Sequence, residues 1–290
     1  MRIVVFTSLA MIAFAANSIL CRLALGEGAI DAASFSALRL VSGAVALFLI
    51  VAAKGSRELR GRGSWASASM LFLYAVPFSF AYVSLDAGTG ALILFGAVQL
   101  TMLVAALVWG ERLHVQQWTG LSVAVAGLVF LLMPGLTAPS PTGSALMVVA
   151  GVSWGVYSLI GRGSLDPLGD TAGSFVRSVP LLLLLAFGGA PMLHASPYGV
   201  ALAVCSGALT SGVGYAIWYA ALRGLSAAQA GIVQLSVPVL AAAGGVLFLS
   251  EAITLRLLVS TVLILGGVAL AFVKRERNHR GDAEPATETA

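Results

Sequence analysis

The sequence predicts an all-α integral membrane protein of ten transmembrane helices, built as two inverted five-helix repeats with both termini in the cytoplasm. Three observations support this fold class: an apolar composition, the placement of basic residues in loops, and a duplicated set of motifs. Of the 290 residues, 59% are hydrophobic and 10% are charged, and the mean hydropathy is +0.98. Soluble domains carry about 25% charged residues. A soluble fold could not cover this much apolar surface.

Ten apolar stretches are each long enough to cross a hydrocarbon core of about 30 Å as a helix. The first stretch is longer than the apolar region of a signal peptide and lacks a small-residue cleavage site, so we interpret it as a retained helix. The predicted helices cover residues 3–22, 32–53, 65–85, 89–109, 114–133, 143–161, 171–189, 197–221, 225–249 and 253–273.

The loops between these helices differ in charge. With the N-terminus in the cytoplasm, 12 of the 16 Lys and Arg residues lie on the cytoplasmic side and only Arg22 and Arg256 lie outside. The positive-inside rule therefore predicts a multi-pass protein of the inner (cytoplasmic) membrane with both termini in the cytoplasm. The basic clusters set topology and indicate no nucleic-acid partner. Residues 276–290 are polar and are expected to form a disordered cytoplasmic tail.

Short motifs recur along the chain at a nearly constant spacing. The repeated pairs, at offsets of 138 to 140 residues, are 18–22 with 158–162, Arg39 with Arg177, Glu111 with Glu251 and Gly127 with Gly267. We therefore divide the chain into a first repeat, 1–136, and a second repeat, 137–275. Because each repeat holds an odd number of helices, the second copy enters the membrane from the opposite side. Inverted repeats of this kind are a structural basis of alternating access.

These motifs resemble the EamA repeats of the drug/metabolite transporter superfamily over residues 5–273. The shared features are an aromatic residue (Phe14, Trp154) before Ser-x-x-x-Arg, an Arg early in the second helix and a Glu closing the fourth. Two departures are Phe14, where the family motif opens with Trp, and Pro238, whose counterpart is Val98. Both put any transfer of substrate specificity in doubt.

The resemblance implies a transporter, most readily an exporter of amino-acid-like metabolites or amphipathic drugs. It implies a central cavity lined by the first four helices of each repeat. The fifth and tenth helices would then be peripheral and available for homodimerisation. The expected partners are a small-molecule solute and membrane lipid.

Two glutamines lie at membrane depth. Gln99 is at the centre of the fourth predicted helix and Gln234 lies in the ninth. Each amide offers two donors and an acceptor, enough to fix the polar group of a solute. The alternative is an ordinary hydrogen bond between helices. We expect both to be candidate substrate-binding residues.

Several aromatic residues lie away from the helix ends where membrane aromatics usually gather. Trp154 and Tyr157 are three residues apart and share one helix face. Together with Tyr82, Tyr215 and Trp218, they could give a solute a stacking surface. Plain packing between helices is the alternative.

Charged residues form a second group, with structural or gating roles. Arg39 and Arg177 lie early in the second and seventh helices, where they could snorkel to an interface or pair with a carboxylate or an anionic substrate. Glu111 and Glu251 could cap the N-terminus of the next helix, or act as proton-binding or gating carboxylates. No Asp or Glu lies at the centre of a predicted helix. The sequence therefore gives no positive evidence for proton coupling.

Three prolines interrupt predicted helices. Pro77, Pro180 and Pro238 each remove a backbone donor and mark plausible bending points, as do Gly212 and Gly214. Close helix packing through small residues is an equally good interpretation of the glycines.

An intramembrane enzyme and a non-transporting scaffold or sensor are the alternative functions. His114, His194 and His279 lie in loops, at helix ends or in the tail, so no catalytic dyad or histidine-rich metal site can form at membrane depth. A Gly-x-x-x-x-Gly-Lys phosphate loop does not occur. We therefore predict a transporter without enzymatic activity, cofactor or metal.

Overall fold

The computed structural model describes residues 2–54, 62–110, 115–135, 138–161, 164–187, 194–222, 225 and 233–272. This part of the chain is helical and contains no strand, apart from one isolated bridge between Ile30 and Ala195. The elements are α1 (Arg2–Gly26), α2 (Ala32–Ala53), α3 (Trp65–Ala81), α4 (Ala87–Val108), α5 (Val115–Leu132), α6 (Pro141–Gly161), α7 (Pro167–Leu181), α8 (Leu183–Phe187), α9 (Pro197–Cys205), the π-helix η1 (Ser206–Val213), α10 (Gly214–Leu222), α12 (Ser236–Leu249) and α13 (Leu255–Phe272). The all-α prediction is confirmed.

Each predicted helix contains a helix of the structure, so about ten apolar helices are present. The seventh prediction corresponds to α7 and the short α8, and the eighth corresponds to α9, η1 and α10 in continuous succession. Seven helical spans are long and apolar enough to cross a membrane. Three shorter apolar helices, α3, α12 and α13, accompany them. The described chain therefore has the helices of a multi-pass membrane protein.

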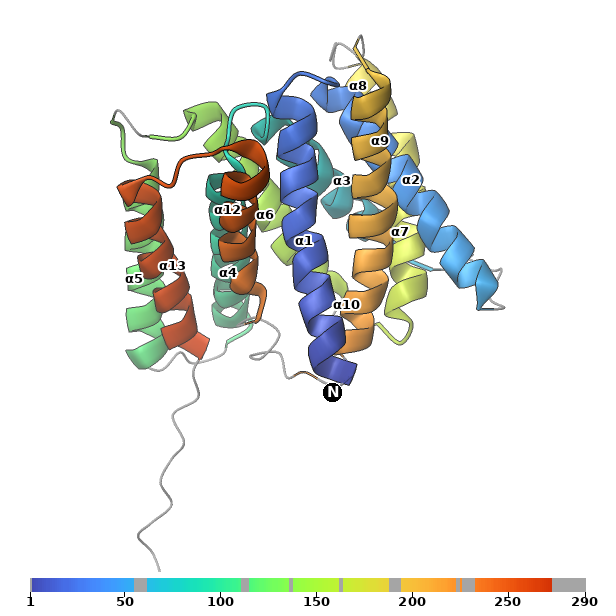
Figure 1. Ribbon diagram of the computed structural model, residues 1–290. Helices are drawn as coiled ribbons and strands as arrows, with labels where there is room; N and C mark the ends of the chain where they lie inside the picture. The colour runs from blue at the N-terminus through green and yellow to red at the C-terminus, as the bar shows by residue number, and fades with distance from the viewer. Residues whose placement is uncertain are drawn as a thin grey trace, which may run out of the picture.

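The helices form a bundle in which distant parts of the sequence pack together. Figure 1 shows α5 and α13 side by side at one edge, α4 and α12 next to them, and α1 in the centre. Helix α1 also packs against η1 and α10, whereas α3 packs against α6 and α7. The start of α1 and the end of α13 lie at the same end of the bundle (Figure 1).

Glycines allow the closest helix contacts. A Cβ atom on Gly207 of η1 would collide with the carbonyl oxygen of Arg39 and the hydroxyl of Ser42 in α2. A Cβ atom on Gly120 of α5 would collide with the carbonyl oxygen of Gly267 in α13. Small residues let helix backbones approach in this way in membranes, where no hydrophobic force drives helices together.

Loop side chains cap several helices. Asp31 accepts a hydrogen bond from the backbone N–H of Ser34 at 2.8 Å at the start of α2, and another from the backbone N–H of His194 at 3.3 Å. Burial opposes the charged form of Asp31, but these hydrogen bonds outweigh it and lower its pKa. Asp31 thus joins the loop after α1 to the loop before α9.

The three prolines have different effects. Helix α3 continues through Pro77 without a break, so the interruption predicted there is not observed. Helix α7 ends one residue after Pro180, and Pro238 lies in the first turn of α12, where a backbone donor is not required. Neighbouring helices can satisfy a carbonyl freed by proline inside a membrane helix, which is why such prolines are tolerated.

Candidate functional site

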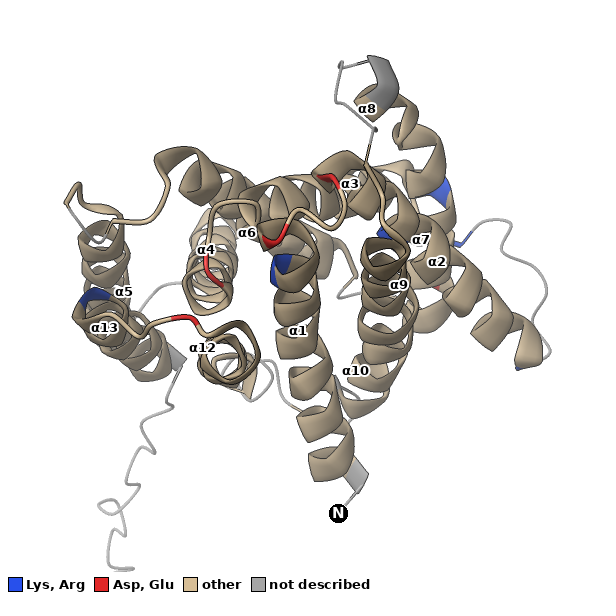
Figure 2. Ribbon diagram, turned by 45° about the horizontal axis from the view of Figure 1, so that its top comes forward, with Lys and Arg blue, Asp and Glu red and all other residues tan. Residues whose placement is uncertain are grey.

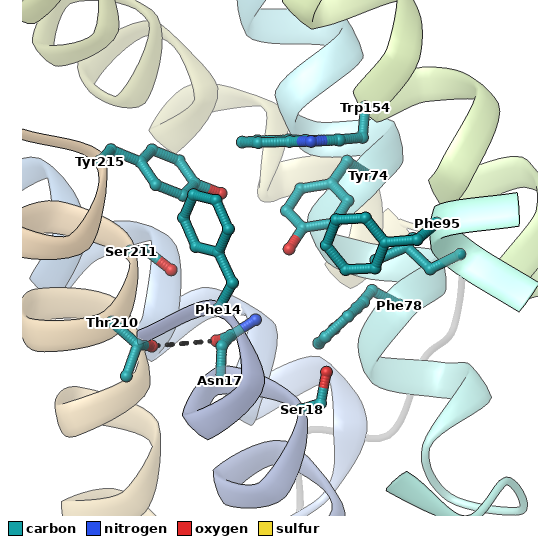
Figure 3. A pocket seen from close by; sticks show the side chains of 11 residues that line it. Phe14, Asn17, Ser18, Tyr74, Phe78, Phe95, Trp154, Thr210, Ser211 and Tyr215 are labelled. Carbon is teal, nitrogen blue, oxygen red and sulfur yellow. Dashed lines mark hydrogen bonds between the residues drawn. The ribbon is translucent and has the colours of Figure 1, made fainter. Parts of the chain in front are cut away.

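A small cavity lies at the centre of the bundle, between α1, α3, α4, α6, η1 and α10. It is lined by Phe14, Asn17, Ser18, Tyr74, Phe78, Leu94, Phe95, Trp154, Thr210, Ser211 and Tyr215 (Figure 3). About 20 Å³ is open to the centres of water molecules. Since one water needs roughly 10–15 Å³ by this measure, the cavity has room for about one water. A larger solute requires the helices or side chains to move.

The upper wall in Figure 3 is aromatic and is centred on Trp154 of α6. Its ring centroid lies 4.8 Å from Tyr74, 5.0 Å from Tyr215 and 6.4 Å from Phe14. These rings are tilted or edge-on, arrangements that aromatic side chains favour because of their quadrupoles. The wall offers apolar faces together with the hydroxyls of two tyrosines.

The opposite side of the cavity is polar and is organised by Asn17 of α1. Its Oδ1 accepts a hydrogen bond from Oγ of Ser206 at 2.7 Å. The hydroxyl of Thr210, 3.2 Å from the same Oδ1, shares its one hydrogen with the carbonyl oxygen of Ser206 at 2.7 Å. The bond from Ser206 orients the amide so that its nitrogen points into the cavity (Figure 3). The π-helical turn η1 presents both hydroxyls to α1, and π-helical turns are frequent at functional sites.

Arg39 of α2 is buried directly beside this cavity and is 1% exposed. Its Nη2 donates to Oη of Tyr74 at 2.9 Å, and its Nε donates to Oγ of Ser211 at 3.4 Å. The guanidinium lies over the rings of Tyr74 at 5.1 Å and Phe78 at 4.8 Å. The snorkelling interpretation is therefore wrong for Arg39, because the packing of η1 and α3 against α2 separates it from the interface.

Arg177, the repeat counterpart of Arg39, has a different environment. It is half-buried near the end of α7. Its Nη1 donates to the carbonyl oxygens of Arg62 and, at 3.2 Å, Gly173. The two arginines are thus equivalent in sequence but not in structure, and only Arg39 adjoins the cavity.

The aromatic residues predicted for the site fall into two layers. Trp154 and Tyr215 line the cavity. Tyr157 stacks against Trp154 at 5.5 Å and Trp218 contacts Phe14 at 5.8 Å, so both support the wall from behind. The fifth predicted aromatic residue, Tyr82, is completely buried at the end of α3. Its ring centroid lies 4.8 Å from that of Phe78, which lines the cavity.

The two glutamines lie away from the central cavity. Gln99 is 2% exposed and lines a second small cavity between α4, α5 and α13. Gln234 is buried just before α12, next to Leu235, which packs against Ala124 of α5 and Val268 of α13. The structure therefore does not bring the predicted amides and the predicted aromatic residues together in one site.

An ionic cluster joins the two halves of the chain at one end of α1. Arg22 Nε donates to Oε1 of Glu251 at 3.2 Å, and Arg22 also lies 3.6 Å from Oδ1 of Asp86. Figure 2 shows a basic segment near the end of α1 and acidic segments at the start of α4 and after α12. The Glu251 carboxylate accepts the backbone N–H of Ala87 at 2.9 Å. Glu251 thus caps α4, not the following helix as predicted, because the loop after α12 folds back onto the start of α4.

Burial raises the pKa of Glu251, and the negative charge of Asp86 adds to this effect. The N–H of Ala87 and the guanidinium of Arg22 oppose it. Glu111, its counterpart in the first repeat, lies outside the described residues.

Several cavity residues carry a sequence signal that the prediction did not use. Phe14, Asn17 and Ser18 are three or four residues apart and share one face of α1, and Asn17 is a buried amide at membrane depth. Tyr74 and Ser211 carry no such local signal, since only the packing of α2 brings them to Arg39. Within the described residues, no group of three metal-ligating side chains occurs.

A bundle of apolar spanning helices around a central cavity, lined from both halves of the chain, is the architecture of a multi-pass membrane protein and is typical of the transporter class. The EamA-like transporter family model matches residues 1–133 and 141–273, so the chain belongs to this family. Members of the family are transporters, not enzymes.

Two relatives and one solved structure are similar to this chain over most of its length. It is 52% identical to an uncharacterized protein of Pseudomonas aeruginosa over 94% of this chain and 96% of that one. It is 28% identical to a probable terminal-alkyne amino-acid exporter of Streptantibioticus cattleyicolor over 82% of this chain and 83% of that one. A solved crystal structure is similar to this chain with a TM-score of 0.63 at 22% identity, and the match covers 91% of this chain and 98% of that one. The last similarity concerns the fold alone.

Proposed function

We propose that this protein exports small amino-acid-like or amphipathic solutes by alternating access, with the central cavity as the solute site. The observation that supports this best is the cavity itself, which both halves of the chain line with an aromatic wall and a polar side. Such a mixture of apolar surface and a few oriented polar groups is typical of small-molecule sites. The narrow state of the cavity is proposed to be one step of the transport cycle.

The packing of the helices supports two inverted repeats, 1–136 and 137–275. The packing of α3 against α6 has its repeat counterpart in the packing of η1 and α10 against α1. The packing of α4 against α6 likewise has its counterpart in the packing of α12 against α1. Phe14 and Trp154, which are 140 positions apart, meet beside the cavity with ring centroids 6.4 Å apart. A pair of halves related in this way can exchange conformations and open one site to each side in turn.

We further propose that both termini face the cytoplasm across the inner membrane. The start of α1 and the end of α13 lie at one end of the bundle, and the basic loops favour the cytoplasm for that end. The cluster of Arg22, Asp86 and Glu251 then lies at the outer face, where it holds α1, α4 and the loop after α12 together. It would keep the outer side closed in this conformation.

The amino-acid class of solute is a proposal supported by the name of the exporter from Streptantibioticus cattleyicolor. The cavity is compatible with this class, since the aromatic wall suits an apolar side chain of the solute and the polar side suits the polar end of an amino acid. Gln99 and Gln234, in contrast, are proposed to stabilise the packing of α4 and α12 beside α5 and α13.

The outward faces of α5 and α13 are proposed to contact lipid or a second copy of the chain. The two helices pack closely on each other and expose large apolar side chains, including Val129 and Val262. The mass of the protein in lipid nanodiscs would separate a homodimer from a monomer.

Flux into proteoliposomes tests the proposed function. Purified protein would be reconstituted and uptake of a panel of the twenty amino acids measured with and without a pH gradient, with protein-free liposomes as the control. We expect saturable uptake of at least one amino acid. Absence of flux across the panel would contradict the proposal and favour a scaffold or sensor.

A further inference from the structure

We infer that Arg39, together with the hydroxyls of Tyr74 and Ser211, forms the recognition site for the carboxylate of the transported solute. This inference rests on the proposed function and names the group of the solute that is selected. It assigns to Arg39 a role in specificity beside the cavity.

The first argument is an imbalance of charge. Within the described residues, no Asp or Glu lies within 4.0 Å of Arg39, and its buried Nη1 has no hydrogen-bond partner. Removing one charge from water without an opposite charge is energetically unfavourable. Charged residues inside membrane helices almost always pair with another group or mark a pathway for a solute or ion. An anionic group of the solute would supply the missing partner.

The second argument is the position of the two groups that Arg39 does contact. Tyr74 and Ser211 both line the cavity, and each hydroxyl accepts a hydrogen bond from the guanidinium. A hydroxyl that accepts from a cation can donate its own hydrogen to an anion. The two hydroxyls therefore connect the positive charge of Arg39 to the cavity.

The third argument is the character of the remaining wall. The lining contains no carboxylate, and the nitrogen of the Asn17 amide points into the cavity from another side (Figure 3). Hydrogen bonds in which one partner is ionised are about twice as strong as neutral ones. A carboxylate bound here would meet donors from Tyr74, Ser211 and Asn17, with Arg39 behind them, while its apolar side chain lies against Trp154.

A purely structural role makes a different prediction. The guanidinium lies over the Tyr74 and Phe78 rings, and cation–π contacts could make Arg39 a strut between α2 and α3. Loss of a strut would lower stability and would not change the preference between two solutes of the same shape. The preference between an acid and its amide therefore separates the two roles.

The test compares L-phenylalanine with L-phenylalaninamide, or the acid and amide of whichever amino acid gives the highest flux. Competition against labelled substrate in proteoliposomes gives the affinity ratio of acid to amide. For the wild type we expect a ratio of at least ten. Arg39→Gln should bring the ratio close to one, whereas Arg39→Lys should keep part of the preference because it keeps the charge. Arg177→Gln, at the repeat-related position away from the cavity, is the matched control and should keep the wild-type ratio.

Three results would overturn the inference. The first is a wild-type ratio near one, which needs no variant. The second is a folded Arg39→Gln protein with the wild-type ratio. If Arg39→Gln does not fold, Ser211→Ala replaces it, and an unchanged ratio in that variant is the third. Absence of uptake of every amino acid by the wild type would instead remove the proposed function and this inference with it.

Discussion

Asn17 illustrates how one side chain can organise a site inside a membrane protein. Its oxygen accepts a hydrogen bond from the hydroxyl of Ser206 in the other half of the chain, so its nitrogen is directed at the cavity. Gln99 has the same functional group and is equally buried, yet it lies between α4, α5 and α13. The amide alone does not define a site, because its position in the packed bundle decides what it can contact.

Substitution of these two amides compares the two positions. We expect Asn17→Ala to lower solute flux at least tenfold, because lost hydrogen bonds to a charged group are worth about 1.5–3 kcal/mol. Folded protein should be largely retained, since a hydrogen bond between membrane helices contributes only about 0.6 kcal/mol. Gln99→Ala should leave flux near the wild-type value. Flux that is lost in Gln99→Ala and kept in Asn17→Ala would move the solute site to α4.

Glu251 gives a prediction for pH. Its pKa is raised in the folded protein, mainly by burial, so the folded state holds the proton more tightly than the unfolded state. Between the ordinary glutamate pKa of about 4.3 and the raised value, unfolding releases a proton and stability falls as pH rises. The melting temperature of the wild type should therefore fall relative to that of Glu251→Gln as pH rises above about 4.3. A difference that is constant, or that moves the other way, would contradict the pKa direction.

At the scale of the elements, hydropathy was sufficient to locate the helices of the described residues, because each predicted stretch contains at least one. It could not show that the eighth helix contains the π-helical turn η1, or that this turn packs backbone to backbone against α2 at Gly207. The sequence offered Gly212 and Gly214 as bending points or packing sites, and packing also proved important at Gly207. These features depend on which helices meet, which a single sequence does not encode locally.

The contact between η1 and α2 can be tested with alanine. Gly207→Ala would place a methyl group against the carbonyl oxygen of Arg39 and the hydroxyl of Ser42. Overpacking of this kind costs about 1–3 kcal/mol. We expect a lower melting temperature and reduced flux. Gly266→Ala on the exposed face of α13 is the control, because no atom lies within 4 Å of its added Cβ and helix propensity favours alanine. Equal melting temperatures for the two variants would argue against close packing at η1.

At the scale of the whole molecule, the repeat predicts more of the architecture than of the site. The offset of about 140 residues relates Phe14 to Trp154, and these two rings meet beside the cavity. The same offset suggested a shared framework role for Arg39 and Arg177, but only Arg39 is buried next to the cavity. Specific recognition of an asymmetric solute requires the halves to differ, so we expect the residues that select the solute to be those that differ between the repeats.

Accessibility of the central cavity from each side tests alternating access most directly. Ser18→Cys, in a Cys21→Ala and Cys205→Ala background that still transports, places one thiol in the cavity lining. A membrane-impermeant maleimide would be applied to the outside or the inside of oriented vesicles during transport. Ser260→Cys, at a buried position of α13, is the control and should react from neither side. We predict that the Ser18→Cys thiol reacts from both sides and that transported solute slows both reactions. Reaction from one side only, while flux continues, would contradict a single cavity that opens to each side in turn.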